Sequence, residues 1–232
     1  TSTAGWSSSK LFSAVNDDGK IQPMVKRPAL AQHPSGGYLV TVATGKFIEE
    51  GDKANVDVQS IYGIWDKPFA GTVSGRTELV KQSFTAATGG RTLSSNAVDW
   101  KTKRGWYIDL SLSAGERVIG DLQIMDNVAM LATTLAPTSD LCEGGGVSQL
   151  MAINYLSGGV ATNAVFAVNG TTFIGLSSVT IAGTVANPAW VTVKPGQRVG
   201  LSNRLDGGGP QEIGFKSGIN PFRTWHQLTI KH

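Results

Sequence analysis

Residues 38–66 have the sequence YLVTVATGKFIEEGDKANVDVQSIYGIWD. Two runs rich in β-branched and aromatic residues, 38–44 and 59–65, flank a loop of acidic and small residues. This pattern predicts two antiparallel strands joined at an exposed end of a sheet. Similar strand–loop–strand units recur along the chain without a sequence repeat of fixed length, which excludes a repetitive propeller of the WD type.

The composition favours an all-β fold. Of the 232 residues, 29 are Gly, 41% are apolar and only 16% are charged, whereas roughly 25% charged residues are usual in soluble domains. Helices prefer Ala, Leu, Glu and Lys, and the apolar positions show no sustained helical periodicity. The length allows one all-β domain or two small ones.

The remaining strands are predicted from short apolar runs between turn residues. They cover residues 78–85, 105–112, 118–125, 128–135, 148–155 and 222–232, with a polar loop over 89–99. Asp126-Asn127 is typical of a two-residue hairpin turn. Spacing and turn chemistry alone allow a sandwich, a barrel or a propeller.

The charge pattern points to an exported protein without nucleic acid as a partner. The net charge is only +3, and Trp100 and Trp106, which flank the densest basic cluster, are more typical of a core than of base stacking. The sequence contains no run of 18 apolar residues, so no membrane span is predicted. The chain opens without an initiator Met or a leader, so we interpret it as a mature or cleaved segment.

The acidic loop at 49–57 is the candidate metal site. Asp52, Asn55 and Asp57 can supply three oxygen ligands, and calcium takes six to eight, usually from alternating positions around a Gly. The loop lacks that spacing, and a solvated acidic loop explains these residues equally well.

Cys142 is the single cysteine. Two interpretations stay open: a buried free thiol, or a half-cystine whose partner lies outside this chain.

No catalytic or cofactor-binding residue is assigned. The segment around Ser148 lacks the second Gly of a nucleophile elbow. Gly45-Lys46 is followed by Phe47, where a phosphate-binding loop needs Ser or Thr for magnesium.

Several short motifs follow one another in the order found in a known family. They are YGIWD at 62–66, GWYIDL at 105–110, GERV at 115–118, Cys142 with the glycines after it, and WHQL at 225–228. Through them the chain resembles the C-terminal domain of the PilY1/PilC family of type IV pilus tip and biogenesis proteins. The section 160–215 has no such landmark.

The resemblance implies that residues 1–232 are the C-terminal portion of a modified β-propeller, about two to three blades of antiparallel strands with long loops. The low-charge section 160–215, rich in Gly, Ala, Val and Thr, is a candidate insert. The family's calcium loop would lie upstream of Thr1, so no cofactor is expected within the chain.

The resemblance also implies a non-enzymatic function in pilus assembly, at the pilus tip or in surface adhesion. The expected partners are the upstream portion of the same protein, minor pilins and a host or abiotic surface. The expected location is the cell surface and pilus tip, or the periplasm and outer membrane. The alternatives are a secreted propeller enzyme of the quinoprotein dehydrogenase type, or a lectin-like domain.

Overall fold

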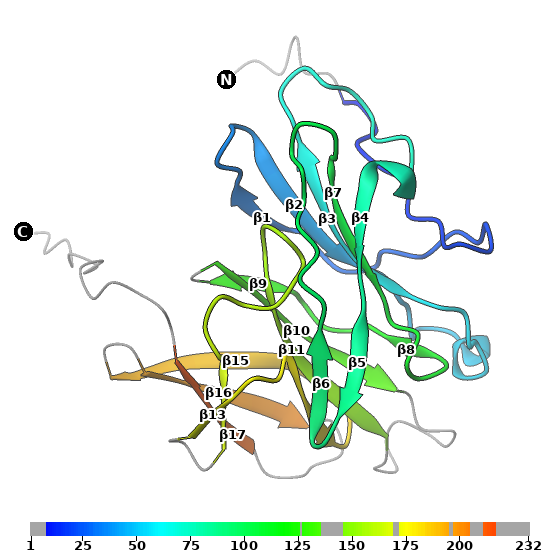
Figure 1. The fold of residues 1–232 in the computed structure, drawn as a ribbon. Helices are drawn as coiled ribbons and strands as arrows, with labels where there is room; N and C mark the ends of the chain where they lie inside the picture. The colour runs from blue at the N-terminus through cyan, green and yellow to red at the C-terminus, as the bar shows by residue number, and fades with distance from the viewer. Residues whose placement is uncertain are drawn as a thin grey trace, which may run out of the picture.

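The computed structural model describes residues 8–125, 127–135, 146–168, 172–194, 197–204 and 211–216. Within these residues the chain forms three β-sheets and two short 3-10 helices, η1 (Glu50–Lys53) and η2 (Arg76–Glu78). The expected all-β class is therefore confirmed. In Figure 1 the first sheet occupies the upper part of the molecule, and the other two lie below it.

The first sheet has the strand order β1-β2-β3-β7-β4. Its strands are β1 (Ala29–Gln32), β2 (Tyr38–Ala43), β3 (Ser60–Asp66), β7 (Gly105–Asp109) and β4 (Leu79–Gln82). Strands β2 and β3 pair from Tyr38–Asp66 to Ala43–Ile61, which confirms the predicted strand pair. All pairs in this sheet are antiparallel except β4 with β7, which is parallel.

The second sheet has the order β5-β6-β14-β11-β10-β8, and β9 also pairs with β10. Its strands are β5 (Phe84–Ala87), β6 (Gly90–Leu93), β14 (Ser178–Ala182), β11 (Val147–Asn154), β10 (Val128–Leu135), β8 (Glu116–Arg117) and β9 (Gln123–Met125).

The third sheet has the order β13-β12-β17-β16-β15. Its strands are β13 (Thr172–Ile174), β12 (Phe166–Val168), β17 (Gln211–Lys216), β16 (Gln197–Arg204) and β15 (Val185–Lys194).

Apolar side chains hold the sheets together as layers. Alternate residues of β10 and β11 point to opposite faces: Leu131 and Met151 belong to a cluster shared with the first sheet, whereas Ala132 and Leu150 belong to a cluster shared with Phe166 of β12. A third cluster covers the outer face of the first sheet. Burial on both faces explains why the central strands are apolar at consecutive positions.

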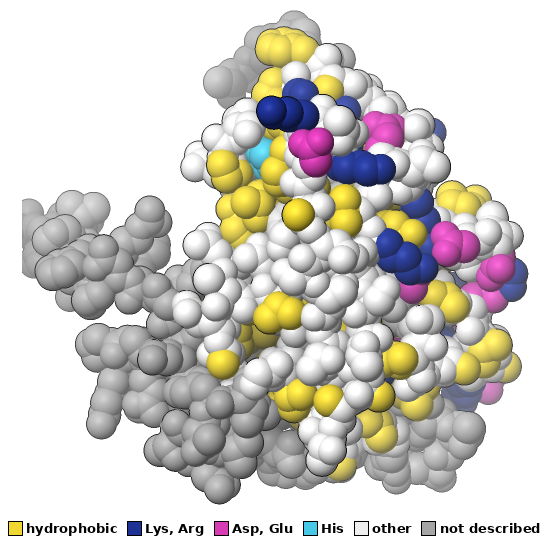
Figure 2. All heavy atoms as spheres, in the orientation of Figure 1, with side chains coloured by type: hydrophobic (Ala, Val, Ile, Leu, Met, Phe, Trp, Pro, Cys, Tyr) yellow, Lys and Arg dark blue, Asp and Glu magenta, His cyan; other side chains and the backbone are white. Residues whose placement is uncertain are grey.

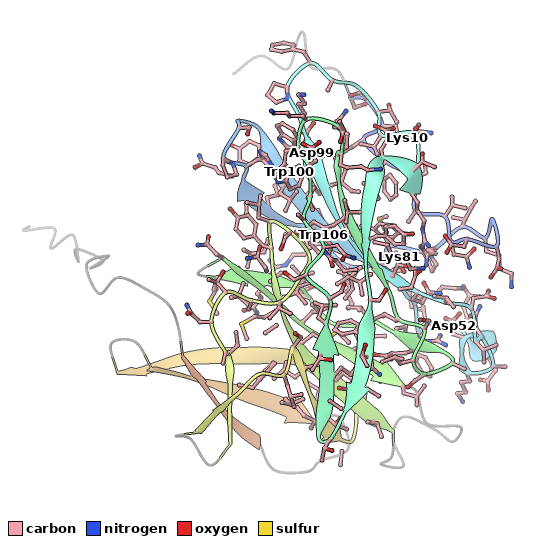
Figure 3. The ribbon with its side chains drawn as sticks, viewed as in Figure 1. Lys10, Asp52, Lys81, Asp99, Trp100 and Trp106 are labelled. Atoms are coloured by element: carbon pink, nitrogen blue, oxygen red, sulfur yellow. The ribbon has the colours of Figure 1, made fainter. Side chains whose placement is uncertain are left out.

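Trp106 of β7 is completely buried where the first and second sheets meet (Figure 3). A Cβ placed on Gly63 of β3, its cross-strand neighbour, would lie 2.2 Å from the indole, and one placed on Gly158 would also lie 2.2 Å from it. The indole Nε1 donates a hydrogen bond of 3.0 Å to the Tyr155 carbonyl, just after β11. The absence of a Cβ at both glycines therefore allows the two sheets to close on Trp106.

An ion pair lies inside the second sheet. The Arg91 guanidinium of β6 donates two hydrogen bonds, of 2.8 and 2.7 Å, to the two carboxylate oxygens of Glu116 of β8. Thr133 of β10 also donates to Glu116. Both ionic side chains are less than a tenth exposed, so removing one partner would leave the other charged and unpaired.

Two expectations about the region after residue 78 are wrong. The predicted strand over 78–85 is divided at Ser83 into β4 and β5, which belong to different sheets. The predicted polar loop over 89–99 contains β6, because Arg91 turns inward to pair with Glu116 and does not face solvent.

The predicted strand over 118–125 is also wrong over most of its length. Only its last three residues form β9. The amide of Val118 donates to the carbonyl of Thr44 beyond the end of β2, so the chain leaves the second sheet there.

Part of the sequence-based interpretation stays a prediction. Cys142, residues 225–228 and the predicted strand over 222–232 lie outside the described residues. Within the section 160–215, β14 pairs with β11 and β6 of the second sheet; whether the section is an insert stays a prediction.

The contact between Gly63 and Trp106 gives a test of the fold. The variant Gly63→Ala should lose about 3 kcal/mol of unfolding free energy, because a methyl group would overlap a buried indole that has no room to move. Urea denaturation followed by tryptophan fluorescence would measure the loss. The control is Gly51→Ala, where a Cβ meets nothing within 4 Å, and a similar loss in both variants would contradict the prediction.

Candidate functional site

The acidic loop between β2 and β3 forms the first candidate site, and η1 lies within it. Figure 3 places Asp52 in this loop, which protrudes at the edge of the molecule. Figure 2 shows basic and acidic side chains gathered together over the same edge. A pocket of about 250 Å³ opens there, lined by Ile21, Pro23, Lys46, Asp52, Asn55, Asp57, Gln59 and Arg117.

Asp52 holds the turn of the loop in place. Its side chain is 4% exposed, and Oδ2 accepts hydrogen bonds from the amides of Ile48 at 2.8 Å and Glu49 at 3.0 Å. The Lys46 ammonium lies 3.3 Å from Oδ1. The two amides, followed by Lys46, keep the pKa of the Asp52 carboxyl below its usual value. Asp52 is thus a capping residue of η1 as well as a pocket residue.

Arg117 of β8 fixes the loop from beneath. Its buried guanidinium donates to the backbone carbonyls of Gly115, Lys46, Asp52 and Asn55. Burial lowers the pKa of Arg117, but a guanidinium remains cationic in proteins. A cation satisfied by four carbonyl dipoles ties residues 46–55 to the second sheet.

Asn55 and Asp57 face the open side of the pocket. Asn55 Oδ1 accepts from the amide of Asp57 at 2.9 Å, and the Asp57 carboxylate forms an ion pair with Lys20. Gln59 is 7% exposed, and its Oε1 has no hydrogen-bond partner among the residues that the structure describes. The pocket therefore presents mixed donors and acceptors whose charges are already paired.

The three candidate metal ligands lie around one pocket, but each carboxylate is paired with a lysine. A metal ion would have to displace Lys46 from Asp52 and Lys20 from Asp57. In the described part of the chain, no group of three or more His, Cys, Asp or Glu side chains is arranged to hold a metal. The ligand role of Asp52, Asn55 and Asp57 stays a prediction, as does the pairing of Cys142.

Exposed apolar side chains lie in the pocket lining and on the acidic loop. Ile21 is 85% exposed, Ile48 74% and Val56 64%. Ile21 lines the pocket, and Ile48 and Val56 belong to the acidic loop itself. Exposed apolar side chains beside polar groups are compatible with a protein-binding surface.

A second exposed feature is Phe69, in the loop that follows β3. Its side chain is fully exposed, and its φ of 61° lies in the left-handed region that non-glycine residues rarely adopt. The Arg104 guanidinium holds the loop by donating to the carbonyls of Trp65, Ala70 and Gly71. The turn thus presents an aromatic ring to solvent at a cost in backbone strain, which is typical of a functional residue.

Sequence reasoning found the acidic loop but not the residues that hold it. Arg117 lies in the GERV motif, which indicated only a family resemblance. Its partners are backbone carbonyls up to 71 residues away in sequence, so residue type alone gave no signal. Phe69 was missed because residue type alone does not show whether an aromatic side chain is exposed or buried.

Comparison with known proteins identifies relatives of the chain. Residues 4–94 match the family model of the PilY1 beta-propeller domain. The type IV pilus biogenesis factor PilY1 of Pseudomonas aeruginosa is 33% identical over 184 residues, covering 67% of this chain and 16% of the relative. A PilY1 homolog of Xylella fastidiosa is 34% identical over 167 residues, covering 66% of this chain and 13% of the relative.

A solved structure has the same fold. The crystal structure of the Pseudomonas aeruginosa PilY1 C-terminal domain matches with a TM-score of 0.71 and 23% sequence identity, covering 90% of this chain and 48% of that chain. The resemblance to the PilY1/PilC family and the fold class, part of a modified β-propeller, are thus confirmed. The chain spans about half of that domain and about one sixth of the length of the Pseudomonas relative.

The hydrogen bonds to Asp52 predict an acid-sensitive loop. A carboxyl whose pKa is lowered by folding contributes stability above its unfolded pKa of about 3.9, and this stability is lost as pH falls through the lower folded value. The variant Asp52→Asn should therefore be less stable than the parent by about 1–2 kcal/mol at pH 7, and the difference should shrink towards pH 2.

Urea denaturation of both proteins between pH 7 and pH 2 would measure this difference. The matched control is Glu50→Gln in the same 3-10 helix, where the side chain is 92% exposed and little change is expected. A difference between Asp52→Asn and the parent that is the same at every pH would contradict the charge-based explanation.

Proposed function

We propose that this chain is a portion of a type IV pilus biogenesis factor that promotes pilus assembly and lies at the pilus tip. The observation that carries the proposal is the similarity over two thirds of the chain to proteins named as type IV pilus biogenesis factors. Because the chain covers only a small share of those proteins, their function reaches this chain as a proposal.

The proposed role is one of binding, not catalysis. The carboxylates of the acidic loop are engaged by lysines and backbone amides, which favours a rigid recognition surface over a proton-transfer site. The pairing of these carboxylates also argues against the alternative of a propeller dehydrogenase, because such an enzyme would need a funnel of charged groups around a cofactor. The name of the relatives also favours an assembly role.

The proposed partners are the upstream portion of the same protein and the minor pilins of the pilus tip. Such a protein would be exported and would lie at the cell surface or in the periplasm and outer membrane. No helix in the described part of the chain is long and apolar enough to span a membrane. The pocket of the acidic loop, with exposed Ile21, Ile48 and Val56, is the surface we assign to a protein partner.

Phe69 supports a role in surface adhesion. An exposed aromatic ring on a loop held by Arg104 loses little conformational entropy on binding, and buried aromatics dominate binding energy at interfaces. Trp65, beneath this loop, stacks on His33 with ring centroids 4.0 Å apart, and its Nε1 donates to the Gly36 carbonyl. The base of the loop is therefore rigid.

Deletion of the segment in the native host tests the assembly role. A strain whose gene lacks residues 1–232 should have few or no surface pili and should not move by twitching, and the full gene should restore both. Electron microscopy and a surface-pilin assay would measure piliation. Normal piliation, together with turnover of sugars or alcohols by the purified protein, would refute the proposal in favour of the enzyme.

The adhesive role is tested by Phe69→Gly. Glycine adopts the left-handed conformation at no steric cost, so the variant should be at least as stable as the parent and should support normal piliation. Attachment of cells to glass or to epithelial monolayers should fall. The control is Leu30→Thr, an apolar side chain that is 61% exposed on β1 and belongs to neither proposed surface. Equal attachment by Phe69→Gly and the parent would remove Phe69 from the adhesive surface.

A further inference from the structure

A second pocket, of about 200 Å³, lies on the first sheet beside the turn at 16–19. It is lined by Asn16, Asp17, Asp18, Val58, Arg76, Lys81, Asp109 and Ser111. Lys81 projects from β4 towards the turn, in Figure 3 as in the contact of 3.6 Å between its Nζ and Asp17 Oδ2. Val58 belongs to the connection between β2 and β3, but none of these residues lines the acidic-loop pocket described above.

Alternating charges build a fixed frame around this pocket. The Asp109 carboxylate, 9% exposed, lies 3.0 Å from Arg76 Nη2 and 3.0 Å from Lys81 Nζ. Arg76 Nη1 also donates to Asp17 Oδ1 at 2.8 Å. The Tyr107 ring lies beneath both cations, 4.5 Å from the Arg76 guanidinium and 5.6 Å from Lys81 Nζ.

Buried partners immobilise the frame. Arg76 Nη2 donates to the Tyr62 hydroxyl at 2.7 Å and to Ser60 Oγ at 2.9 Å. Ser60 Oγ in turn donates to Asp109 Oδ1 at 2.7 Å. The positions of Arg76 and Asp109 are thus set by the core of the first sheet before any ligand arrives, which lowers the cost of binding.

Asn16 carries a donor that this frame does not use. Its Oδ1 accepts from the amides of Asp18 and Lys20 at 3.0 and 2.8 Å and so fixes the turn. Asn16 is only 7% exposed, and its buried Nδ2 has no hydrogen-bond partner among the described residues. A buried donor without an acceptor is unfavourable. Asn16 also lines the pocket, so we assign this donor to a ligand oxygen.

We propose that this pocket binds a neutral polyhydroxylated molecule of the size of one sugar ring. Three carboxylates and two cations line it, a formal charge of −1, so a free anion is disfavoured, and the two cations oppose a bare metal ion. Hydroxyl groups both donate and accept. A ligand carrying several of them can accept from Asn16 and donate to Asp17 and Asp18, while Val58 meets its C–H face.

The size of the pocket agrees with this assignment. Sites for drug-sized ligands have volumes of about 300–1,000 Å³, larger than the one here. A volume of about 200 Å³ favours a ligand of one ring over a larger one. The proposal does not depend on the role in pilus assembly, because it concerns binding by the purified chain.

Titration of the full chain with single sugars tests the proposal. The probes are D-glucose, D-galactose, D-mannose and N-acetylglucosamine, followed by chemical shifts of the backbone amides. At least one should bind with a Kd of about 1–10 mM, as expected for a small ligand with few apolar contacts, and should shift the amides of the 16–19 turn and Ser111.

The variant Asn16→Asp separates the ligand contact from the fold. It keeps the acceptor that fixes the turn, but it replaces the Nδ2 donor by an acceptor oxygen and adds a negative charge, so sugar binding should weaken about tenfold. The matched control is Asn154→Asp, since Asn154 Oδ1 fixes the same kind of turn by accepting from the amides of Leu156 and Ser157. This control should bind sugar as the parent does.

A second variant covers the case in which Asn16→Asp fails to fold. Ser111 is exposed at the pocket edge, so Ser111→Trp should fold normally and should block the pocket by its bulk. The absence of saturable binding of all four sugars would overturn the proposal, as would binding that both variants leave unchanged. Binding of inorganic phosphate at this turn without binding of any sugar would equally overturn it.

Discussion

The contact of Trp106 with two glycines is the constraint on which the rest of the structure depends. Gly63 belongs to the first sheet, and Gly158 follows the central strand of the second. Because the indole fills the space between the sheets and leaves no room for a Cβ, it sets how closely they approach. The acidic loop is fixed to both sheets, so its geometry follows from this contact.

Strand β8 places two charged side chains where the second sheet meets the acidic loop. It has only two residues, Glu116 and Arg117, and successive side chains of a strand point to opposite sides. Glu116 pairs with Arg91 inside the second sheet, whereas Arg117 donates to the carbonyls of the acidic loop. Two adjacent ionic residues therefore stabilise a core and position a surface, although neither is exposed.

The sequence predicted the strands wherever residue pattern and burial agree. Strands β2, β3, β10 and β11 have long apolar or β-branched runs and were placed to within about a residue or two, the usual uncertainty of strand ends. Strand β6 was missed because its buried Arg91 resembles a loop residue until its partner Glu116, 25 positions later, is known. The break at Ser83 could not be predicted from composition, because the residues of both β4 and β5 are typical of strands.

The candidate sites were predictable only in part, for a related reason. Asp52, Asn55 and Asp57 were found because a cluster of polar and acidic residues within one loop is visible in the sequence. Arg76 was not, because its partners Asp17, Tyr62 and Asp109 are dispersed along the chain and meet only when the first sheet forms. Sites assembled from distant, common residue types leave no local pattern for a sequence to show.

The burial of the sheets determines where this fold can bind anything. Apolar clusters cover much of both faces of the first and second sheets, and the third sheet packs on one face of the second, so little of either face is free for a partner. Binding is left to the connections at the ends and edges of the first sheet, and there the acidic loop, the Phe69 turn and the 16–19 turn are found. Each is held by one guanidinium, from Arg117, Arg104 and Arg76 respectively. Connections can change in sequence without disturbing the layers, provided that these arginines keep their acceptors. The same layers can therefore carry connections of different sequence.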